Sequence, residues 1–254
     1  MIKSIKNKLS REIKIKLLYN FRSYKSFFYI GKLTKLAQIH KTDKYGDHRY
    51  TQHYQKHFSP FQYKKINLLE IGVGGYKSPI VGGNSLRMWK SFFLFSNIFS
   101  LDIYDKSQLQ EKRIRIFKGS QTDKKLLDTI CKEVDGFDII IDDGSHINNH
   151  VITTFKHLFP RLKKGGIYVI EDTQTSYWEQ MGGSSIEFNR KDTIYGFFKS
   201  LIDGLNSEEY LIEGYNKTYY DKHIVSMHFY HNLIFIYKGD NNENSKFVEN
   251  NKLK

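Results

Sequence analysis

The chain opens with an apolar pattern of helical spacing. Isoleucines and leucines recur every three or four residues, with lysines between them, at Ile2, Ile5, Leu9, Ile13 and Leu17. This pattern predicts a basic amphipathic helix. It fits an ordinary surface helix of a lysine-rich protein, a helix that packs on a partner, or contact of residues 1–20 with an anionic membrane.

From residue 66 the apolar pattern changes to buried strands that alternate with amphipathic helices. The expected strands are 66–72, 97–105, 113–120, 137–146 and 167–173. The expected helices are 85–93, 122–134, 150–166, ending at a glycine pair, and 193–205. Residues 223–239 alternate around His231-Asn232 and predict a terminal β-hairpin. The fold class is therefore α/β, with a doubly wound, mostly parallel seven-stranded sheet and a C-terminal antiparallel hairpin.

Basic residues are concentrated in the first 40 residues of the chain. The net charge is +13, and residues 1–40 hold ten Lys or Arg but only one acid, Glu12. The remainder is nearly balanced, so basic charge is not spread around a site, which argues against nucleic acid as a substrate. We expect a basic N-terminal arm at 1–40, one enzymatic domain at 41–240 and a polar tail at 241–254.

The single cysteine, Cys131, cannot form a disulfide within the chain and favours a reducing compartment, the cytoplasm. No apolar run approaches the roughly 20 residues of a membrane-spanning helix. Any membrane contact is therefore expected to be peripheral, at the inner face of the membrane. The oligomeric state stays open, and a homo-oligomer fits.

Glycines follow the first expected strand in LLEIGVGGY (68–76). Glycine allows a tight turn and a close approach of the backbone to a ligand, although many α/β proteins have such a turn for packing alone. The second strand ends at Asp102, where an acid is expected to accept hydrogen bonds from a ribose diol. Glu70, in the first strand, suits a ligand with a cationic amino group, such as S-adenosylmethionine. Ordinary solvation of strand ends is the alternative for both acids.

Acidic residues also follow the fourth and fifth strands, in IIIDDGSH (139–146) and IYVIEDT (167–173). Neighbouring parallel strands lie about 4.8 Å apart and open on the edge where ligands bind. Up to four carboxylates then converge beside His146, and their repulsion is relieved by a hard divalent cation such as Mg²⁺. Histidine suits the role of general base. A solvated acidic rim with an unrelated histidine is the alternative.

These motifs together resemble the class I S-adenosylmethionine-dependent methyltransferases. The similarity is to the metal-dependent sugar O-methyltransferases of macrolide biosynthesis, and it covers roughly residues 42–240. It is carried by TDKYGDHRYTQHYQKHF, LLEIGVGGY, GGNSLRMWK, SLDIYDKS, GSQTD, DIIIDDGSH and GGIYVIEDTQTSYW.

The resemblance implies a role for each matching residue. The Mg²⁺ ligands would be Asp143, Glu171 and Asp172, and the general base would be His146. The cofactor-binding residues would be Glu70, Gly72, Gly74 and Asp102, with Gln121 and Asp123 toward the adenine and Tyr50 and Thr51 closing the site. The aromatic side chains of Tyr177, Trp178, Tyr195 and Phe197 would shape a sugar pocket, with core packing as the alternative for Phe197.

The function implied is Mg²⁺-dependent methyl transfer from S-adenosylmethionine to a sugar hydroxyl. The acceptor sugar could belong to a surface polysaccharide, a glycolipid or a glycosylated metabolite. Two other functions stay open. An NAD-dependent oxidoreductase on the same sheet would bind NAD but gives no reason for paired acids at strand ends. A non-catalytic methyltransferase-like domain would bind a membrane or partner through the arm and would tolerate loss of the acid–histidine cluster.

Overall fold

The computed structural model describes residues 11–254, so Ile2, Ile5 and Leu9 of the predicted amphipathic helix lie outside the described residues. Seven strands form a mostly parallel sheet in the order β3-β2-β1-β4-β5-β7-β6. The predicted α/β fold class with a C-terminal antiparallel hairpin is confirmed. The chain divides into two compact units, Met1–Ser120 and Gln121–Lys254.

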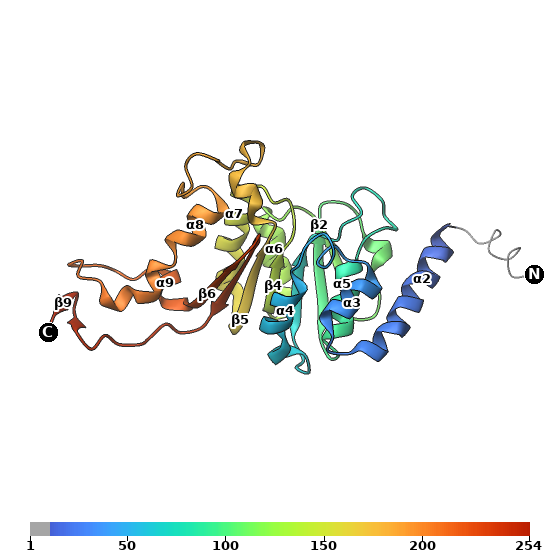
Figure 1. The fold of residues 1–254 in the computed structure, drawn as a ribbon, viewed down its shortest axis with the longest axis horizontal. Helices are drawn as coiled ribbons and strands as arrows, with labels where there is room; N and C mark the ends of the chain where they lie inside the picture. Colours follow the sequence, from blue (N-terminus) through green and yellow to red (C-terminus); the bar gives the residue numbers. More distant parts are fainter. Residues whose placement is uncertain (1–10) are drawn as a thin grey trace, which may run out of the picture. The chain divides into compact units, whose positions relative to one another are not determined.

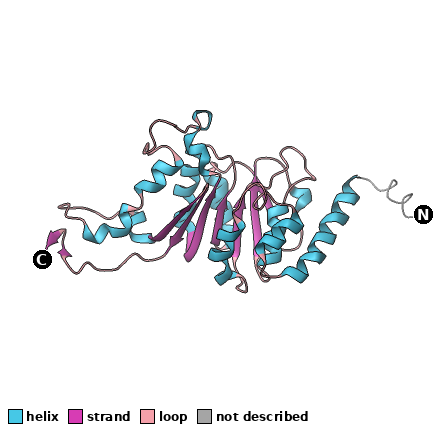
Figure 2. Cartoon of the chain, in the orientation of Figure 1, coloured by secondary structure: helices cyan, strands magenta, loops and turns pink. Residues whose placement is uncertain are grey.

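The first unit contains three parallel strands and the helices that precede and connect them (Figures 1 and 2). The strands are β1 (Asn67–Ile71), β2 (Asn97–Asp102) and β3 (Ile114–Lys118). The helices are α2 (Arg11–Ser26), α3 (Leu33–His40), α4 (Thr51–Phe58) and α5 (Asn84–Phe92), with short 3-10 turns η1 (Phe27–Tyr29), η2 (Ser59–Phe61) and η3 (Ser107–Leu109). Helix α2 contacts α3 and α5.

An aromatic cluster forms the core of the first unit. Trp89 is fully buried, and its ring lies 4.9 Å from that of Tyr54 and 5.6 Å from that of Phe58. Phe93 closes the cluster at 5.7 Å from Phe58. Large rings that contact one another in edge-to-face and tilted arrangements bury much apolar surface for few residues, so α4 and α5 are held firmly together.

The second unit contains the remaining strands and helices. The strands are β4 (Phe137–Asp142), β5 (Leu162–Glu171), β6 (Ile224–Tyr230), β7 (Leu233–Lys238), β8 (Val248–Glu249) and β9 (Lys252–Leu253). The helices are α6 (Lys124–Val134), α7 (Asn148–Leu158), α8 (Ile194–Ser200) and α9 (Tyr219–His223). The 3-10 turns are η4 (Phe159–Arg161), η5 (Thr173–Tyr177), η6 (Glu179–Met181) and η7 (Asp203–Glu209).

Strands β4 and β5 pair in parallel, and β7 pairs antiparallel with both β5 and β6. The hairpin turn lies at the predicted position, where Asn232 adopts a left-handed backbone with φ 58°. Phe155 of α7 packs in the core of this unit, 4.8 Å from the ring of Phe198 and 5.1 Å from that of Tyr168.

The helix predicted over 150–166 is wrong in its last part. Helix α7 ends at Leu158, the turn η4 contains Pro160, and β5 already begins at Leu162. Proline has no backbone N–H to continue the helical ladder, so it ends the helix before the glycines. Gly166 lies within β5 instead, where a Cβ would come within 2.7 Å of the Asp138 carbonyl oxygen. Likewise, α8 ends at Ser200, short of the predicted 205.

Among the described residues, no helix combines the length and hydropathy needed to cross a membrane.

His40 is a buried titratable group that connects three elements of the first unit. Its Nε2 lies 2.9 Å from Ser26 Oγ and 3.1 Å from Ser91 Oγ. Burial lowers the pKa of His40 from 6.5 to about 3, and the positive charges of Arg87, Arg22 and Lys90 act in the same direction. The imidazole is therefore neutral in the folded protein at neutral pH.

We predict that His40 makes the fold sensitive to mild acid. The unfolded chain binds a proton near pH 6.5, whereas folded His40 does so only near pH 3, so the free energy of unfolding falls as pH drops through this window. This contribution amounts to about 2 kcal/mol between pH 7 and pH 5. Urea unfolding at both pH values should show that His40→Gln loses this part of the pH dependence, whereas His231→Gln, at an exposed histidine, keeps it. Equal pH dependence in wild type and His40→Gln would contradict the assignment.

Candidate active site

The carboxyl ends of β4 and β5 bring an acid–histidine cluster together within the second unit. Asp143 directly follows β4, His146 lies in the loop before α7, and Asp172 directly follows β5. His146 Nε2 lies 3.6 Å from Asp172 Oδ2 and 3.9 Å from Asp143 Oδ1. One ligand atom from each of the three side chains lies within 4.8 Å of the others, and all three side chains are partly exposed.

Glu171, the last residue of β5, joins this cluster from a buried position. It is 2% exposed, and one of its carboxylate oxygens lies within 4.8 Å of a carboxylate oxygen of Asp143. The second unit thus places all three predicted metal ligands and the predicted base around one edge of the β4–β5 pair. Carboxylate oxygens at such separations are donors that suit Mg²⁺.

Two members of the cluster have a left-handed backbone, which the sequence did not indicate. His146 has φ 55° and Asp172 has φ 52°. Non-glycine residues adopt this region at some energetic cost, and such positions concentrate at functional sites.

Asp142 belongs to the interior and not to the cluster. Its side chain is 1% exposed, accepts a hydrogen bond from Gln121 Nε2 at 3.1 Å, and lies 3.5 Å from the Tyr168 hydroxyl. Burial raises the pKa of Asp142 to about 7, while the nearby His146 and the Gln121 hydrogen bond oppose that shift. Successive residues at a strand end point to opposite faces, which separates Asp142 from Asp143.

Gln121, predicted to lie toward the adenine, has a fully engaged side-chain amide. Its nitrogen donates to Asp142 and lies 3.1 Å from Thr154 Oγ1, and its oxygen accepts from the Ser145 backbone N–H at 2.8 Å. These bonds tie the DDGSH loop to α7. They show Gln121 as a support of this loop, and contact with a cofactor stays a prediction.

Asn148, which sequence reasoning missed, fastens the segment after Asp172. Its side-chain amide donates to the carbonyl oxygens of Thr175 and Met181, both at 2.9 Å, and accepts from the Ile194 backbone N–H at 2.6 Å. The side chain is buried. The only sequence signal was the polar run HINNH, which does not say which of its two asparagines points inward.

The glycine turn after β1 forms as predicted within the first unit. Gly72 and Gly74 have φ values of 99° and 73°. The Asp102 carboxylate accepts from the Val73 backbone N–H at 3.0 Å and from the Tyr104 backbone N–H at 2.8 Å. Gly75 is required by close packing, because a Cβ there would lie 2.1 Å from the Val81 carbonyl oxygen. The turn is therefore fixed by Asp102 and by the expanded loop that follows.

Glu70 lies in a buried polar arrangement of the first unit. Its carboxylate lies 3.2 Å from the ammonium group of Lys44 and accepts a hydrogen bond from Trp89 Nε1 at 2.9 Å. Both Glu70 and Lys44 side chains are 0% exposed. Lys44 was not singled out from the sequence, because one lysine in so lysine-rich a chain carries no signal of burial.

The other predicted cofactor residues have structural partners. Thr51 is the first residue of α4 and shares a 2.9 Å hydrogen bond with Thr34. Tyr50 is buried and stacks on His48 with ring centroids 4.6 Å apart. In the second unit, Asp123 caps α6 by accepting from the Leu126 backbone N–H.

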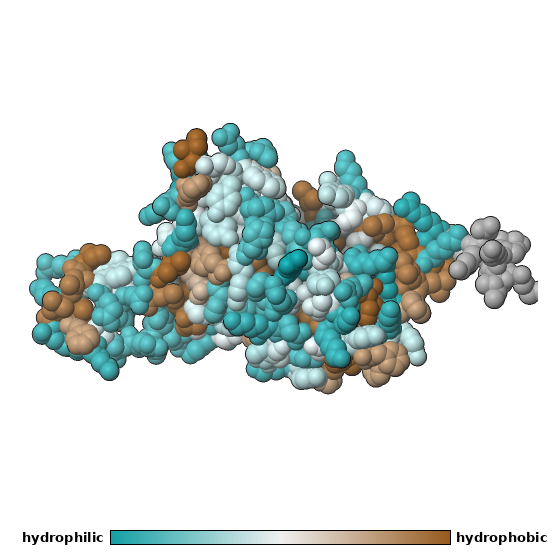
Figure 3. All heavy atoms as spheres, viewed as in Figure 1, coloured by the Kyte–Doolittle hydropathy of each residue, from teal (hydrophilic) through white to brown (hydrophobic). Residues whose placement is uncertain are grey.

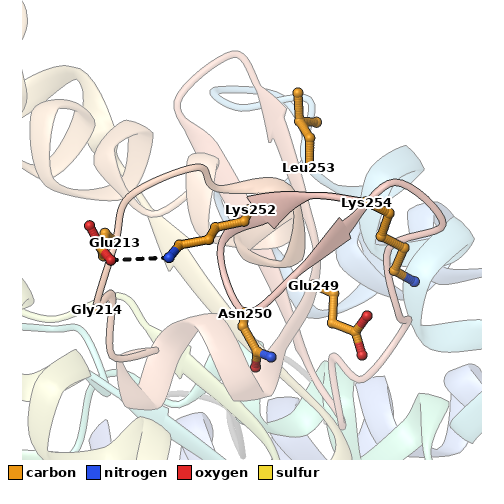
Figure 4. A pocket seen from close by; sticks show the side chains of 7 residues that line it. All are labelled: Glu213, Gly214, Glu249, Asn250, Lys252, Leu253 and Lys254. Atoms are coloured by element: carbon orange, nitrogen blue, oxygen red, sulfur yellow. Dashed lines mark ion pairs between the residues drawn. The ribbon is translucent and has the colours of Figure 1, made fainter.

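A surface hollow near the C-terminus contains none of the predicted residues (Figure 4). It is lined by Glu213, Gly214, Glu249, Asn250, Lys252, Leu253 and Lys254. The ion pair between Lys252 and Glu213, at 3.3 Å, is largely exposed to solvent. Water screens such pairs strongly, so this ion pair contributes little to stability or binding.

The doubly wound sheet, the glycine turn after β1 and the acids at the ends of β4 and β5 define a Rossmann-like α/β fold. No protein-family model matches the chain. It is 48% identical over 214 residues to the mycinamicin VI 2''-O-methyltransferase of Micromonospora griseorubida, an alignment that covers 83% of this chain and 53% of that enzyme. It is 46% identical over 213 residues to the demethylmacrocin O-methyltransferase of Streptomyces fradiae, with 83% and 54% covered.

A solved structure agrees with these relatives. The MycE methyltransferase from the mycinamycin biosynthetic pathway, in complex with Mg and SAH, superposes with a TM-score of 0.81 at 47% identity, covering 84% of this chain and 54% of that one. The resemblance to sugar O-methyltransferases is thereby confirmed over most of the chain. The chain spans about half the length of the relatives it matches.

We predict that Asn148→Ala destabilises the second unit. The change leaves two carbonyl oxygens and one backbone N–H without their side-chain partner, so the free energy of unfolding should fall by about 2–3 kcal/mol. Amide hydrogen exchange at Ile194 should also accelerate. Asn149→Ala provides a matched control, because Asn149 is exposed in the same turn of α7. The assignment fails if both variants unfold at the same denaturant concentration.

Proposed function

We propose that this protein is an enzyme that transfers a methyl group from S-adenosylmethionine to a sugar hydroxyl in the presence of Mg²⁺. The observation that best supports this proposal is the convergence of Asp143, His146 and Asp172 at the ends of two parallel strands. Both relatives described above are named O-methyltransferases, and the solved relative is a complex with Mg and SAH. An NAD-dependent oxidoreductase would leave this cluster without a purpose.

We assign the metal to Asp143, Glu171 and Asp172. Their carboxylates are close enough to repel one another, and a hard divalent cation removes that repulsion. When bound, Mg²⁺ acidifies a coordinated hydroxyl, and S-adenosylmethionine supplies the methyl group that the hydroxyl oxygen receives. Asp142 takes no part, because its carboxylate is buried against Gln121 and Tyr168.

We assign His146 as the general base, which accepts the hydroxyl proton at Nε2. That nitrogen is the one directed at Asp143 and Asp172, so it faces the place where the acceptor oxygen would be held. The backbone of His146 adopts the left-handed region at φ 55°, an uncommon conformation that concentrates at functional sites.

The proposed cofactor residues are Glu70, Gly72, Gly74, Asp102, Gln121, Asp123, Tyr50 and Thr51. Within the first unit, the Asp102 carboxylate and the glycine turn form one hydrogen-bonded structure, which supports a ribose-binding role. The Glu70 carboxylate is shared with Lys44, so its attraction for the amino group of the cofactor would be tempered by a neighbouring ammonium.

The proposed acceptor is a sugar with a free hydroxyl, in a surface polysaccharide, a glycolipid or a glycosylated metabolite. One solved relative is in complex with Mg, SAH and mycinamycin VI. Tyr195 stacks between Tyr177 and Phe229, with ring centroids 5.8 Å and 6.1 Å away. Exposed aromatic faces beside the η5 segment suit the apolar face of a sugar ring. Action in the cytoplasm and a homo-oligomeric state complete the proposal.

We predict that two substitutions in the cluster will have separable effects. Asp172→Asn removes a charged ligand and should weaken Mg²⁺ binding measured by calorimetry. His146→Gln should retain Mg²⁺ and S-adenosylmethionine binding but lower kcat by about 10²–10⁴-fold, because it removes only the proton acceptor. Turnover would be followed as S-adenosylhomocysteine release with a panel of glycosides.

Asp138→Asn and His231→Gln serve as controls, since Asp138 lies in β4 outside the cluster and His231 is exposed in the hairpin turn. Both should behave as wild type. Binding of NAD in place of S-adenosylmethionine, or full turnover by His146→Gln, would refute the proposal.

A further inference from the structure

Helix α2 packs on the first unit through polar side chains. The Tyr19 hydroxyl donates to the Gly82 carbonyl oxygen at 3.3 Å, and the Arg87 guanidinium lies 3.8 Å from the centre of the Tyr19 ring. Further along the helix, Arg22 donates to the His40 carbonyl oxygen at 3.2 Å, and Ser26 bonds the His40 ring at 2.9 Å. These contacts lie on one face, at intervals of three and four residues.

Another face, formed by α2 and the turn η1 that follows it, presents apolar side chains to solvent. Ile13, Leu17, Phe21, Tyr24 and Phe28 follow one another at intervals of four, four, three and four, and they are 45%, 53%, 64%, 69% and 64% exposed. Phe27 of η1 adds to this surface at 70% exposed. Figure 3 shows hydrophobic side chains gathered over α2. We call these six residues the apolar stripe.

This arrangement reverses the usual one. A surface helix of a globular protein normally turns its apolar side chains to the core and its polar ones to water. Here the polar contacts with Gly82, His40 and Arg87 fix the helix with the apolar stripe outward. A contiguous exposed apolar surface of this kind marks a site of interaction.

The lysines that flank the apolar stripe indicate what kind of surface it binds. Lys14, Lys16 and Lys25 are exposed on α2, and Glu12 is its only acid. In a helical projection, Lys14 and Lys25 flank one side of the stripe and Lys16 flanks the other. A symmetric contact with a second copy would bring these lysines against one another, which is unfavourable. An anionic surface with an apolar layer beneath it complements both features.

We propose that α2 and η1 bind the surface of an anionic lipid bilayer, with the apolar stripe in the interface and the lysines on the headgroups. Aromatic side chains such as Phe21, Tyr24, Phe27 and Phe28 suit this interface, which has an apolar side and a wet side. The polar contacts of Tyr19, Arg22 and Ser26 hold the helix in that orientation before binding. The inference is independent of the proposed methyl transfer.

The full chain would be tested by sedimentation with vesicles of phosphatidylcholine alone and of phosphatidylcholine with phosphatidylglycerol. Binding is expected only to the anionic vesicles, and it should weaken as salt is raised. Phe21→Ser/Phe28→Ser should lower the partition coefficient by about tenfold or more. Tyr63→Ser/Phe95→Ser is the matched control, since these aromatic residues of the same unit are 65% and 61% exposed, and it should bind as wild type.

The contribution of the lysines to vesicle binding is tested by the same sedimentation measurement. Lys14→Glu/Lys25→Glu should lower binding by about tenfold or more, whereas Lys65→Glu/Lys112→Glu, with the same change in net charge, should lower it much less. Circular dichroism of each variant verifies folding. Equal binding to neutral and anionic vesicles, or equal losses in the stripe and control variants, would overturn the proposal. So would self-association in the ultracentrifuge that Phe21→Ser/Phe28→Ser abolishes, because it would assign the stripe to a second copy.

Discussion

The parallel pairing of β4 with β5 is the constraint on which the candidate site depends. The register places Ile141 beside Val169 and Asp142 beside Ile170, so the next residues to meet at the edge are Asp143 and Glu171. Two strands whose central residues, Ile139–Ile141 and Ile167–Ile170, are buried and apolar thus deliver carboxylates to one place. Those carboxylates disfavour one another, and the rest of the second unit holds them there by hydrogen bonds that are not part of the cluster. Gln121 ties down one loop, and Asn148 ties down the other.

The site also depends on two backbone turns that carry a cost of their own. Left-handed conformations at non-glycine residues cost of order 1 kcal/mol or more, and both His146 and Asp172 adopt one. Nearby bonds maintain them. The Ser145 hydroxyl lies 3.0 Å from His150 Nδ1, and the Thr173 backbone N–H donates to the Asn232 carbonyl oxygen in the hairpin turn. The C-terminal hairpin therefore supports the loop after β5 as well as extending the sheet.

Most of the fold could be predicted from the sequence because its signals are local. Apolar runs ending in glycine or acid placed β1, β2 and β4, and the alternation around His231-Asn232 placed the hairpin. The glycine pair at 165–166 misled the prediction, because glycines serve helix ends and close strand packing alike. The supporting residues were harder to predict. Nothing in the sequence says that Gln121 meets Asp142, that Lys44 meets Glu70, or that Asn148 and not Asn149 points inward, because these are contacts between distant segments.

The orientation of α2 is a second feature that could not be predicted from the sequence. The spacing of Ile13 and Leu17 correctly indicated an amphipathic helix, but periodicity defines faces without saying which one is turned inward. The usual assumption turns the apolar face to the core. Three side chains of α2 decided the outcome. Arg22 donates to the His40 carbonyl oxygen, and Tyr19 donates to the Gly82 carbonyl oxygen. Ser26 bonds the buried His40 ring, which also bonds Ser91. Buried hydrogen bonds of this kind are costly to leave unmade, so they specify orientation more strictly than apolar contact does. Once these bonds fix one face, the opposite apolar face is left at the surface.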